Sequence, residues 1–123
     1  MTRTVLVVDD SATLRRIVES ALEGAGWTVW SASHGQHALD ELAAREVMPD
    51  LVITDWNMPV MDGLGLLRAL RAVPAYAALP ILVLTTETDD ASKEAARGAG
   101  ATGWLSKPVD VALLCDAIES VLA

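Results

Sequence analysis

The sequence lacks three features that would mark particular classes of protein. It has one cysteine, so no internal disulfide can form, which suits a reducing compartment. No apolar run approaches the roughly 18 residues of a membrane span, and none resembles the core of a signal peptide. Basic residues are few, and the net charge of −8 argues against nucleic acid and anionic membrane as main partners. We therefore expect a cytoplasmic protein.

The chain does contain enough apolar material for one folded domain. Hydrophobic residues make up 52% of its 123 residues, too many for a disordered chain. A domain of this length buries about two thirds of its unfolded surface and needs no metal or disulfide to fold. We expect a single domain over residues 1–123 with no output domain, because helical periodicity continues to the end of the sequence.

Short apolar runs alternate with segments of helical period. The run at 4–8 is apolar throughout, as expected of a strand buried on both faces. Further strands are predicted at 27–31, 51–54, 81–84 and 102–106. Helices are predicted behind caps at Ser11, Ser33 and Asp89 or Asp90, and over 63–72 and 111–122. Five such units predict an α/β fold of the flavodoxin-like (βα)5 type, a doubly wound five-stranded parallel sheet of order 2-1-3-4-5.

Polar groups suited to chemistry follow four of the five predicted strands. They are Asp9 and Asp10, Asp55, Thr85 and Lys107. In a doubly wound sheet, ligands bind outside the carboxyl ends of the strands, so these groups should converge. Three carboxylates stay ionised together when a cation lies between them, and hard oxygen ligands suit Mg²⁺ better than zinc. Each residue alone could be a turn former, a cap or a surface group; their joint placement favours a site.

The segments around these strand ends resemble the signature of response-regulator receiver domains. The matching segments are 7–11, 55–59, 61–63, 85–87 and 101–108. The similarity covers nearly the whole chain, in order and with the spacing of the family. The segments 55–59 and 14–18 are most similar to those of single-domain chemotaxis regulators.

The resemblance implies that Asp55 accepts a phosphoryl group from the phosphohistidine of a sensor histidine kinase. It implies a Mg²⁺ ion held by the side chains of Asp10 and Asp55 and by the backbone carbonyl of Asn57. Asp9 would act on that ion through a water molecule. Asn57 and Glu87 would tune hydrolysis of the acyl phosphate, and both residues match the pattern of regulators with a short-lived phosphoryl state.

The same resemblance implies how phosphorylation is sensed. Lys107 would pair with the carboxylate before transfer and with a phosphoryl oxygen afterwards, aimed by a cis Lys107–Pro108 bond. Thr85 would donate its hydroxyl to another phosphoryl oxygen. Trp104 stands where chemotaxis regulators usually have a switching tyrosine, and it is bulkier and lacks the phenolic hydroxyl.

The predicted fourth helix supports a mobile face, because its expected inward residues are small. They are Ala91, Ala95, Ala96 and Ala99. Small side chains bury little area, so this helix should be the most weakly anchored. Its start carries Asp89 and Asp90 where well-known chemotaxis regulators have lysines, which changes the field that a partner meets.

The resemblance implies a phosphorylation-switched binding protein that catalyses only its own phosphorylation and dephosphorylation. Its partners would be a chemotaxis-type kinase, a target such as the flagellar motor switch, and a phosphatase, with the protein itself monomeric. One alternative is a regulator or phosphate sink in another phosphorelay. Another is a Mg²⁺-dependent aspartyl phosphatase, which usually has a second aspartate where Asn57 stands. A flavodoxin-like electron carrier is a third, although Asp9 and Asp10 would repel a flavin phosphate.

Overall fold

The computed structural model describes residues 3–86 and 90–122. Its strands form one parallel sheet in the order β2-β1-β3-β4-β5, which confirms the flavodoxin-like prediction. The strands are β1 (Thr4–Val8), β2 (Thr28–Ala32), β3 (Leu51–Asp55), β4 (Ile81–Thr85) and β5 (Gly103–Ser106). The helices are α1 (Ala12–Gly24), α2 (Gly35–Ala44), α3 (Gly63–Arg71), α4 (Asp90–Gly98) and α5 (Val111–Leu122), with a 3₁₀ turn, η1, at Pro74–Tyr76.

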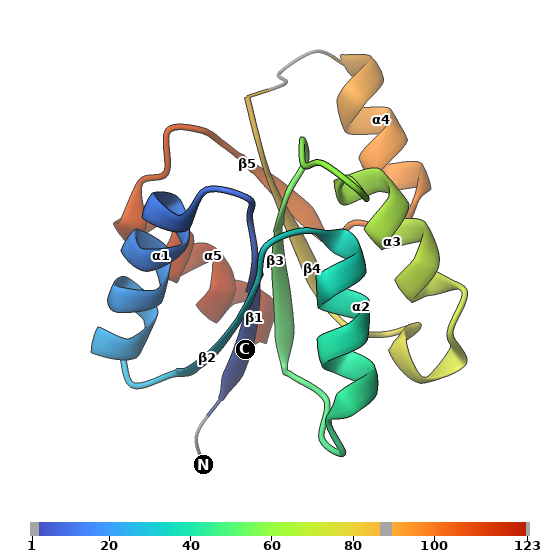
Figure 1. The fold of residues 1–123 in the computed structure, drawn as a ribbon. Helices are drawn as coiled ribbons and strands as arrows, with labels where there is room; N and C mark the ends of the chain where they lie inside the picture. Colours follow the sequence, from blue (N-terminus) through green and yellow to red (C-terminus); the bar gives the residue numbers. More distant parts are fainter. Residues whose placement is uncertain (1–2, 87–89, 123) are drawn as a thin grey trace.

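The helices cover both faces of the sheet (Figure 1), with α1 and α5 on one side and α2, α3 and α4 on the other. Alternate residues of one strand therefore enter two different cores. In β1, Leu6 and Val8 pack toward α2 and α3, whereas Val5 and Val7 pack toward α1 and α5. This two-sided burial explains why the strand has no polar face.

Side-chain caps fix where three helices begin. Ser11 caps α1, as predicted, by accepting a hydrogen bond from the Leu14 N–H at 3.2 Å. Asp62 caps α3 by accepting from the Gly65 N–H at 2.8 Å. The predicted Ser33 cap of α2 is wrong, because His34 takes that position and its Nδ1 accepts from the backbone N–H of His37 at 3.1 Å.

The inward face of α4 differs from the predicted one. Ala96 is buried and Ala99 is half-buried, but Ala91 and Ala95 are exposed, and Ser92 takes an inward position instead. The inward row follows the helical spacing 92, 96, 99. Small residues still form the inward face, because Ala96 is the sole buried residue of this helix within the described part of the chain.

No helix among the described residues combines the length and the apolar character that a membrane span requires.

Candidate functional site

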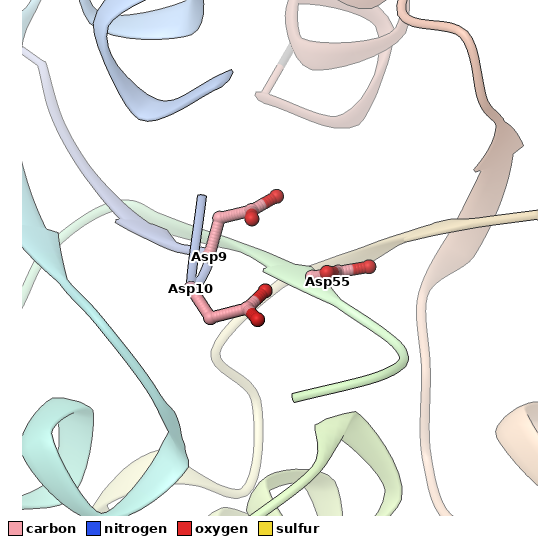
Figure 2. Close-up of side chains that lie close together, drawn as sticks. All are labelled: Asp9, Asp10 and Asp55. Atoms are coloured by element: carbon pink, nitrogen blue, oxygen red, sulfur yellow. The ribbon is translucent and has the colours of Figure 1, made fainter. Parts of the chain in front are cut away.

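The three predicted acids meet at the carboxyl edge of the sheet. β1 and β3 are parallel neighbours with Val8 opposite Thr54, so Asp9 and Asp55 leave the sheet at the same level. Each of Asp9, Asp10 and Asp55 offers one oxygen, and these oxygens lie within 4.8 Å of one another. Figure 2 shows the three side chains side by side, two from the end of β1 and one from the end of β3. Asp9 and Asp55 are 2% and 5% exposed, whereas Asp10 is exposed.

Lys107 brings a positive charge to this cluster from the end of β5. Its Nζ lies 2.9 Å from Oδ1 of Asp55 and 3.6 Å from Oδ2 of Asp9. The Lys107–Pro108 bond is cis, as predicted. Burial lowers the pKa of Lys107, but the hydrogen bond to Asp55 and the negative charges of Asp9 and Asp55 outweigh it, so the pKa is raised. The ammonium therefore stays charged beside the acids.

The ammonium of Lys107 does not provide a hydrogen bond to every oxygen of the two buried acids. Oδ1 of Asp9 accepts a hydrogen bond from the Ser11 N–H at 2.8 Å, whereas Oδ2 is buried and has no hydrogen-bond partner among the described residues. Burial raises the pKa of Asp9, and the charge of Asp55 raises it further, against the lowering effect of the Ser11 N–H. An unpartnered buried oxygen within an all-carboxylate oxygen set fits a hard divalent cation such as Mg²⁺.

An open hollow of about 320 Å³ lies at the exposed side of the acidic cluster. Asp10, Asn57 and Asp62 border it, together with Met58 and Pro59. All five residues belong to the loops that follow β1 and β3. A ligand can thus reach Asp10, the exposed acid of the cluster, directly from solvent.

The loop after β3 contains a strained turn. Val60 has φ +67°, and the Met61 N–H donates to the Pro59 carbonyl at 2.7 Å, which makes a γ-turn of the rare left-handed kind. A β-branched residue is disfavoured in this region. The Met61 carbonyl accepts from the Gly35 N–H at 3.0 Å, so the strained turn connects the border of the hollow to the start of α2.

The sequence and the fold have close relatives among known proteins. The family model of the response regulator receiver domain matches residues 5–119. The chain belongs to the response regulator receiver domain family. It is 41% identical to a chemotaxis protein CheY homolog of Campylobacter jejuni, over 96% of this chain and 91% of that one. It is 40% identical to chemotaxis protein CheY1 of Helicobacter pylori, over 96% and 95% of the two chains. The structure of chemotaxis protein CheY4 of Vibrio cholerae matches with a TM-score of 0.93 at 39% identity, over 99% and 100% of the two chains.

Family membership gives the acidic cluster a context. Receiver domains bind Mg²⁺ at an acidic pocket, and Asp9, Asp10 and Asp55 of this receiver domain form a cluster that could hold a metal ion. Receiver domains are signalling switches of two-component systems rather than classical enzymes, and they work with a histidine kinase and a downstream target.

The two predicted switch residues of this receiver domain lie next to each other. Thr85, at the end of β4, is 5% exposed, and Trp104 in β5 is half-buried. Both border a cavity of about 10 Å³ that is also lined by Ser92 and Ala96 of α4. That volume holds about one water molecule, so an inward turn of the Trp104 indole requires its neighbours to move.

Two predicted residues cannot be compared with the structure. Glu87, expected to tune hydrolysis, and Asp89, one of the two possible caps of the fourth helix, lie outside the described residues. Asp90 is the first residue of α4 and is exposed.

Arg15 is a residue of the site that the sequence reasoning missed. Its Nη1 donates to the backbone carbonyl of Asp9 at 2.5 Å and so ties α1 to the loop that carries Asp9 and Asp10. The available signal was its place one turn into the helix after those acids, where a long basic side chain can reach back to them.

Proposed function

We propose that Asp55 of this receiver domain accepts a phosphoryl group from the phosphohistidine of a sensor histidine kinase. The observation that supports it best is the 2.9 Å contact between Lys107 Nζ and Asp55 Oδ1, next to two further carboxylates. A buried carboxylate with an ammonium beside it is a nucleophile that needs no general base. The solvent-open hollow bordered by Asp10, whose carboxylate lies within 4.8 Å of that of Asp55, leaves room for a donor from another protein.

The transfer proceeds in one displacement. A carboxylate oxygen of Asp55 attacks phosphorus, the bond between phosphorus and the donor imidazole nitrogen breaks, and its electron pair stays on that nitrogen. Lys107 then moves its contact from the carboxylate to a phosphoryl oxygen. Mg²⁺, when bound, neutralises charge on the phosphoryl oxygens. It would be held by Asp10, Asp55 and the carbonyl of Asn57, with Asp9 acting through water.

The phosphoryl group is removed by a separate reaction, hydrolysis of the acyl phosphate, which releases inorganic phosphate. Water attacks phosphorus, the bond to the Asp55 oxygen breaks, and the carboxylate is restored. Asn57 borders the hollow through which such a water approaches, so its side chain is suited to tune the rate. We assign Glu87 the same role in tuning the rate of hydrolysis. The chain catalyses only these two reactions of its own aspartate.

Phosphorylation changes the conformation of the face formed by α4, β5 and α5. The Thr85 hydroxyl turns toward the phosphoryl group, and the space it leaves lets Trp104 turn inward. The nearly filled cavity between them supports this coupling, because neither side chain can move far while the other stays. The changed face then controls contact with a downstream protein.

The names of the relatives suggest chemotaxis as the pathway, with the flagellar motor switch as target. The chain then acts in the cytoplasm as a monomer, served by a chemotaxis-type kinase and a phosphatase. The acidic charge of its output face comes from α5, which contains Asp116 and Glu119 but no lysine or arginine, whereas α4 carries equal numbers of acidic and basic residues. Such a face favours a target segment without strong negative charge.

Tryptophan fluorescence tests the proposal, because Trp56 directly follows Asp55. A variant with Trp27, Trp30 and Trp104 replaced by Phe reports on this position alone. Mg²⁺ is titrated first, and then beryllium fluoride, which stands in for a phosphoryl group on the aspartate. We expect a saturable change with each ligand. Asp55→Asn should remove the beryllium fluoride response, and Asp116→Asn, on the exposed face of α5, should leave it intact. An equal response in Asp55→Asn would reject Asp55 as the acceptor.

A further inference from the structure

Arg71, the last residue of α3, joins three segments of the chain. Its Nε and Nη2 donate to the carbonyl of Gly100 at 3.0 and 2.7 Å. Its Nη1 donates to the carbonyls of Tyr76 at 2.8 Å and Leu79 at 2.7 Å, with Ala77 at 3.3 Å. Gly100 lies between α4 and β5, and Leu79 lies just before β4. These contacts are at the amino edge of the sheet, opposite the acids.

The guanidinium is held by carbonyl oxygens. Arg71 belongs to none of the ion pairs found among the described residues, and burial lowers its pKa. Its planar fork of donors can bridge carbonyls from separate segments, which the single ammonium of lysine cannot do with the same geometry. Gly100 has φ +102°, and a Cβ there would lie 2.8 Å from the Arg71 side chain. A side chain at position 100 would therefore crowd Arg71, and the positive φ itself favours glycine there.

The same region is fixed by further hydrogen bonds. The Ala101 N–H donates to the Ala96 carbonyl at 3.0 Å, and the Thr102 N–H donates to the Ile81 carbonyl at 2.8 Å. The Thr102 hydroxyl in turn accepts from the Ile81 N–H at 3.0 Å. The turn after α4 is thus bonded both to its own helix and to the start of β4.

The other end of α4 has less apolar contact with the rest of the described structure. Between Asp90 and Ala95 no side chain is buried in the described structure, and Ser92 and Lys93 border the small cavity beside Thr85. The end of α4 near the acids therefore has little apolar contact to lose on moving. The end at the amino edge would have to break the Arg71 contacts.

We propose that Arg71 is a positioning residue that fixes the pivot of α4, so that a change at Thr85 turns the helix about its Gly98–Gly100 end. The first half of α4 then moves most and the turn leading into β5 stays in place. The anchoring follows from the Arg71 contacts alone, whereas its use in signalling rests on the proposed function. Hinges of this kind use a few residues at the end of an element.

Distance measurements between spin labels test the pivot. In a Cys115→Ala background, one label is placed at Ser20, exposed on α1, and the second at Ala91 or Gly98 of α4. These two positions are both exposed, are seven residues apart and so lie on one face of the helix, about two turns from each other. Gly98 has open space around its Cβ position. The variants are Arg71→Lys and, as matched control, Arg68→Lys on the exposed side of α3.

Without ligand, we expect the Ser20–Gly98 distribution of the otherwise unchanged protein to be about half as wide as that of Ser20–Ala91. Arg71→Lys should widen the Gly98 distribution about twofold, to match Ala91, and Arg68→Lys should leave both unchanged. Equal widths in the unchanged protein would overturn the proposal, and so would no widening in folded Arg71→Lys. The comparison of the Gly98 and Ala91 widths in the unchanged protein needs no Arg71 variant, so it tests the pivot even if Arg71→Lys fails to fold.

With Mg²⁺ and beryllium fluoride, the Ala91 distance should shift while the Gly98 distance stays, and Arg71→Lys should shift both. Beryllium fluoride affinity should stay within about threefold in Arg71→Lys, because distant sites act independently. Shifts of equal size at both labels in the unchanged protein would overturn the pivot. Failure of the proposed function would show differently, as absence of any beryllium fluoride effect with the unliganded width difference still present.

Discussion

α3 and α4 lie next to each other on the same face of the sheet (Figure 1), yet they are anchored very differently. α3 buries Gly63, Leu66, Leu67 and Leu70, whereas Ala96 is the one buried residue of α4 within the described chain. Each fully buried leucine contributes about 1.5–3 kcal/mol through apolar burial, far more than a buried methyl group. One helix is thus part of the rigid scaffold, and its neighbour is free to serve as a moving part.

The largest expected effect is on the rigid side of this comparison. Leu66→Ala removes a side chain that is 0% exposed and should lower the free energy of unfolding by about 2–5 kcal/mol. Urea denaturation measures it. Leu113→Ala is the control, because Leu113 is 60% exposed and its loss should cost far less. Equal losses in the two variants would contradict the assignment of α3 to the core.

Asp9→Asn tests the effect of a buried charge on stability, whereas Leu66→Ala tests the effect of buried apolar surface. Removing the buried charge of Asp9, which lies beside Asp55 and is only partly offset by the 3.6 Å contact with Lys107, should raise the free energy of unfolding by about 1–2 kcal/mol in the absence of divalent cations. The same change should weaken Mg²⁺ binding. Urea denaturation with and without Mg²⁺ measures both effects, with Asp116→Asn as the exposed control. Destabilisation by Asp9→Asn without Mg²⁺ would show that its charge is already compensated.

The pH dependence of stability follows from the raised pKa of Asp9. Because the folded protein holds the proton of Asp9 more tightly than the unfolded chain, its charge destabilises the fold fully above the folded pKa. This penalty fades as the pH falls from the folded pKa toward 3.8, the ordinary value. Denaturation across this range should show the advantage of Asp9→Asn shrinking toward low pH. If the stability advantage of Asp9→Asn instead grew as the pH fell, the pKa of Asp9 would not be raised in the folded protein.

A smaller effect is expected on the movable side. Ala96→Gly and Ala95→Gly each lose about 1 kcal/mol of helix propensity. Since Ala96 is buried and Ala95 exposed, the difference between the two variants isolates the packing of one methyl group, about 0.8 kcal/mol. Thermal denaturation of both variants gives this difference. A value above about 2 kcal/mol would mean that α4 is anchored almost as firmly as α3.

The smallest effect concerns the contact between α4 and β5. The Arg97 guanidinium carbon lies 5.3 Å from the centroid of a Trp104 ring, and Arg97 also pairs with Glu94 at the surface. Arg97→Gln should change stability by less than about 0.5 kcal/mol and shift the emission of a variant that keeps Trp104 alone. Arg45→Gln, over Trp30 at 3.9 Å, is the matched control and should leave that emission unchanged. A shift of equal size in both would rule out a local effect.

The sheet and the acidic cluster were predictable because their signals are strong. A strand with apolar residues on both faces belongs inside a parallel sheet, and the carboxyl ends of such strands meet at one edge. From this alone Asp9, Asp10 and Asp55 were expected together, with Lys107 near them, and the structure brings all four together. The cis bond before Pro108 was expected from the family resemblance.

Other features left weaker signals in the sequence. The inward row of α4 was misplaced because Ala91, Ala95 and Ala96 do not differ in size, so their spacing indicates no preferred face. The cap of α2 was misplaced because serine is a common cap and an imidazole such as that of His34 is not. Arg71 gave no signal, since its partners are backbone carbonyls that any sequence offers.

The turn at Val60 suggests a position at which a more stable variant of this protein could be made. Its side chain is 78% exposed, so little packing depends on the isopropyl group, while the backbone bears the cost of the left-handed conformation. Glycine adopts a positive φ without the steric penalty of a Cβ. We expect a substitution there to raise the melting temperature without altering an acid, a switch residue or the Arg71 contacts that hold the end of α4.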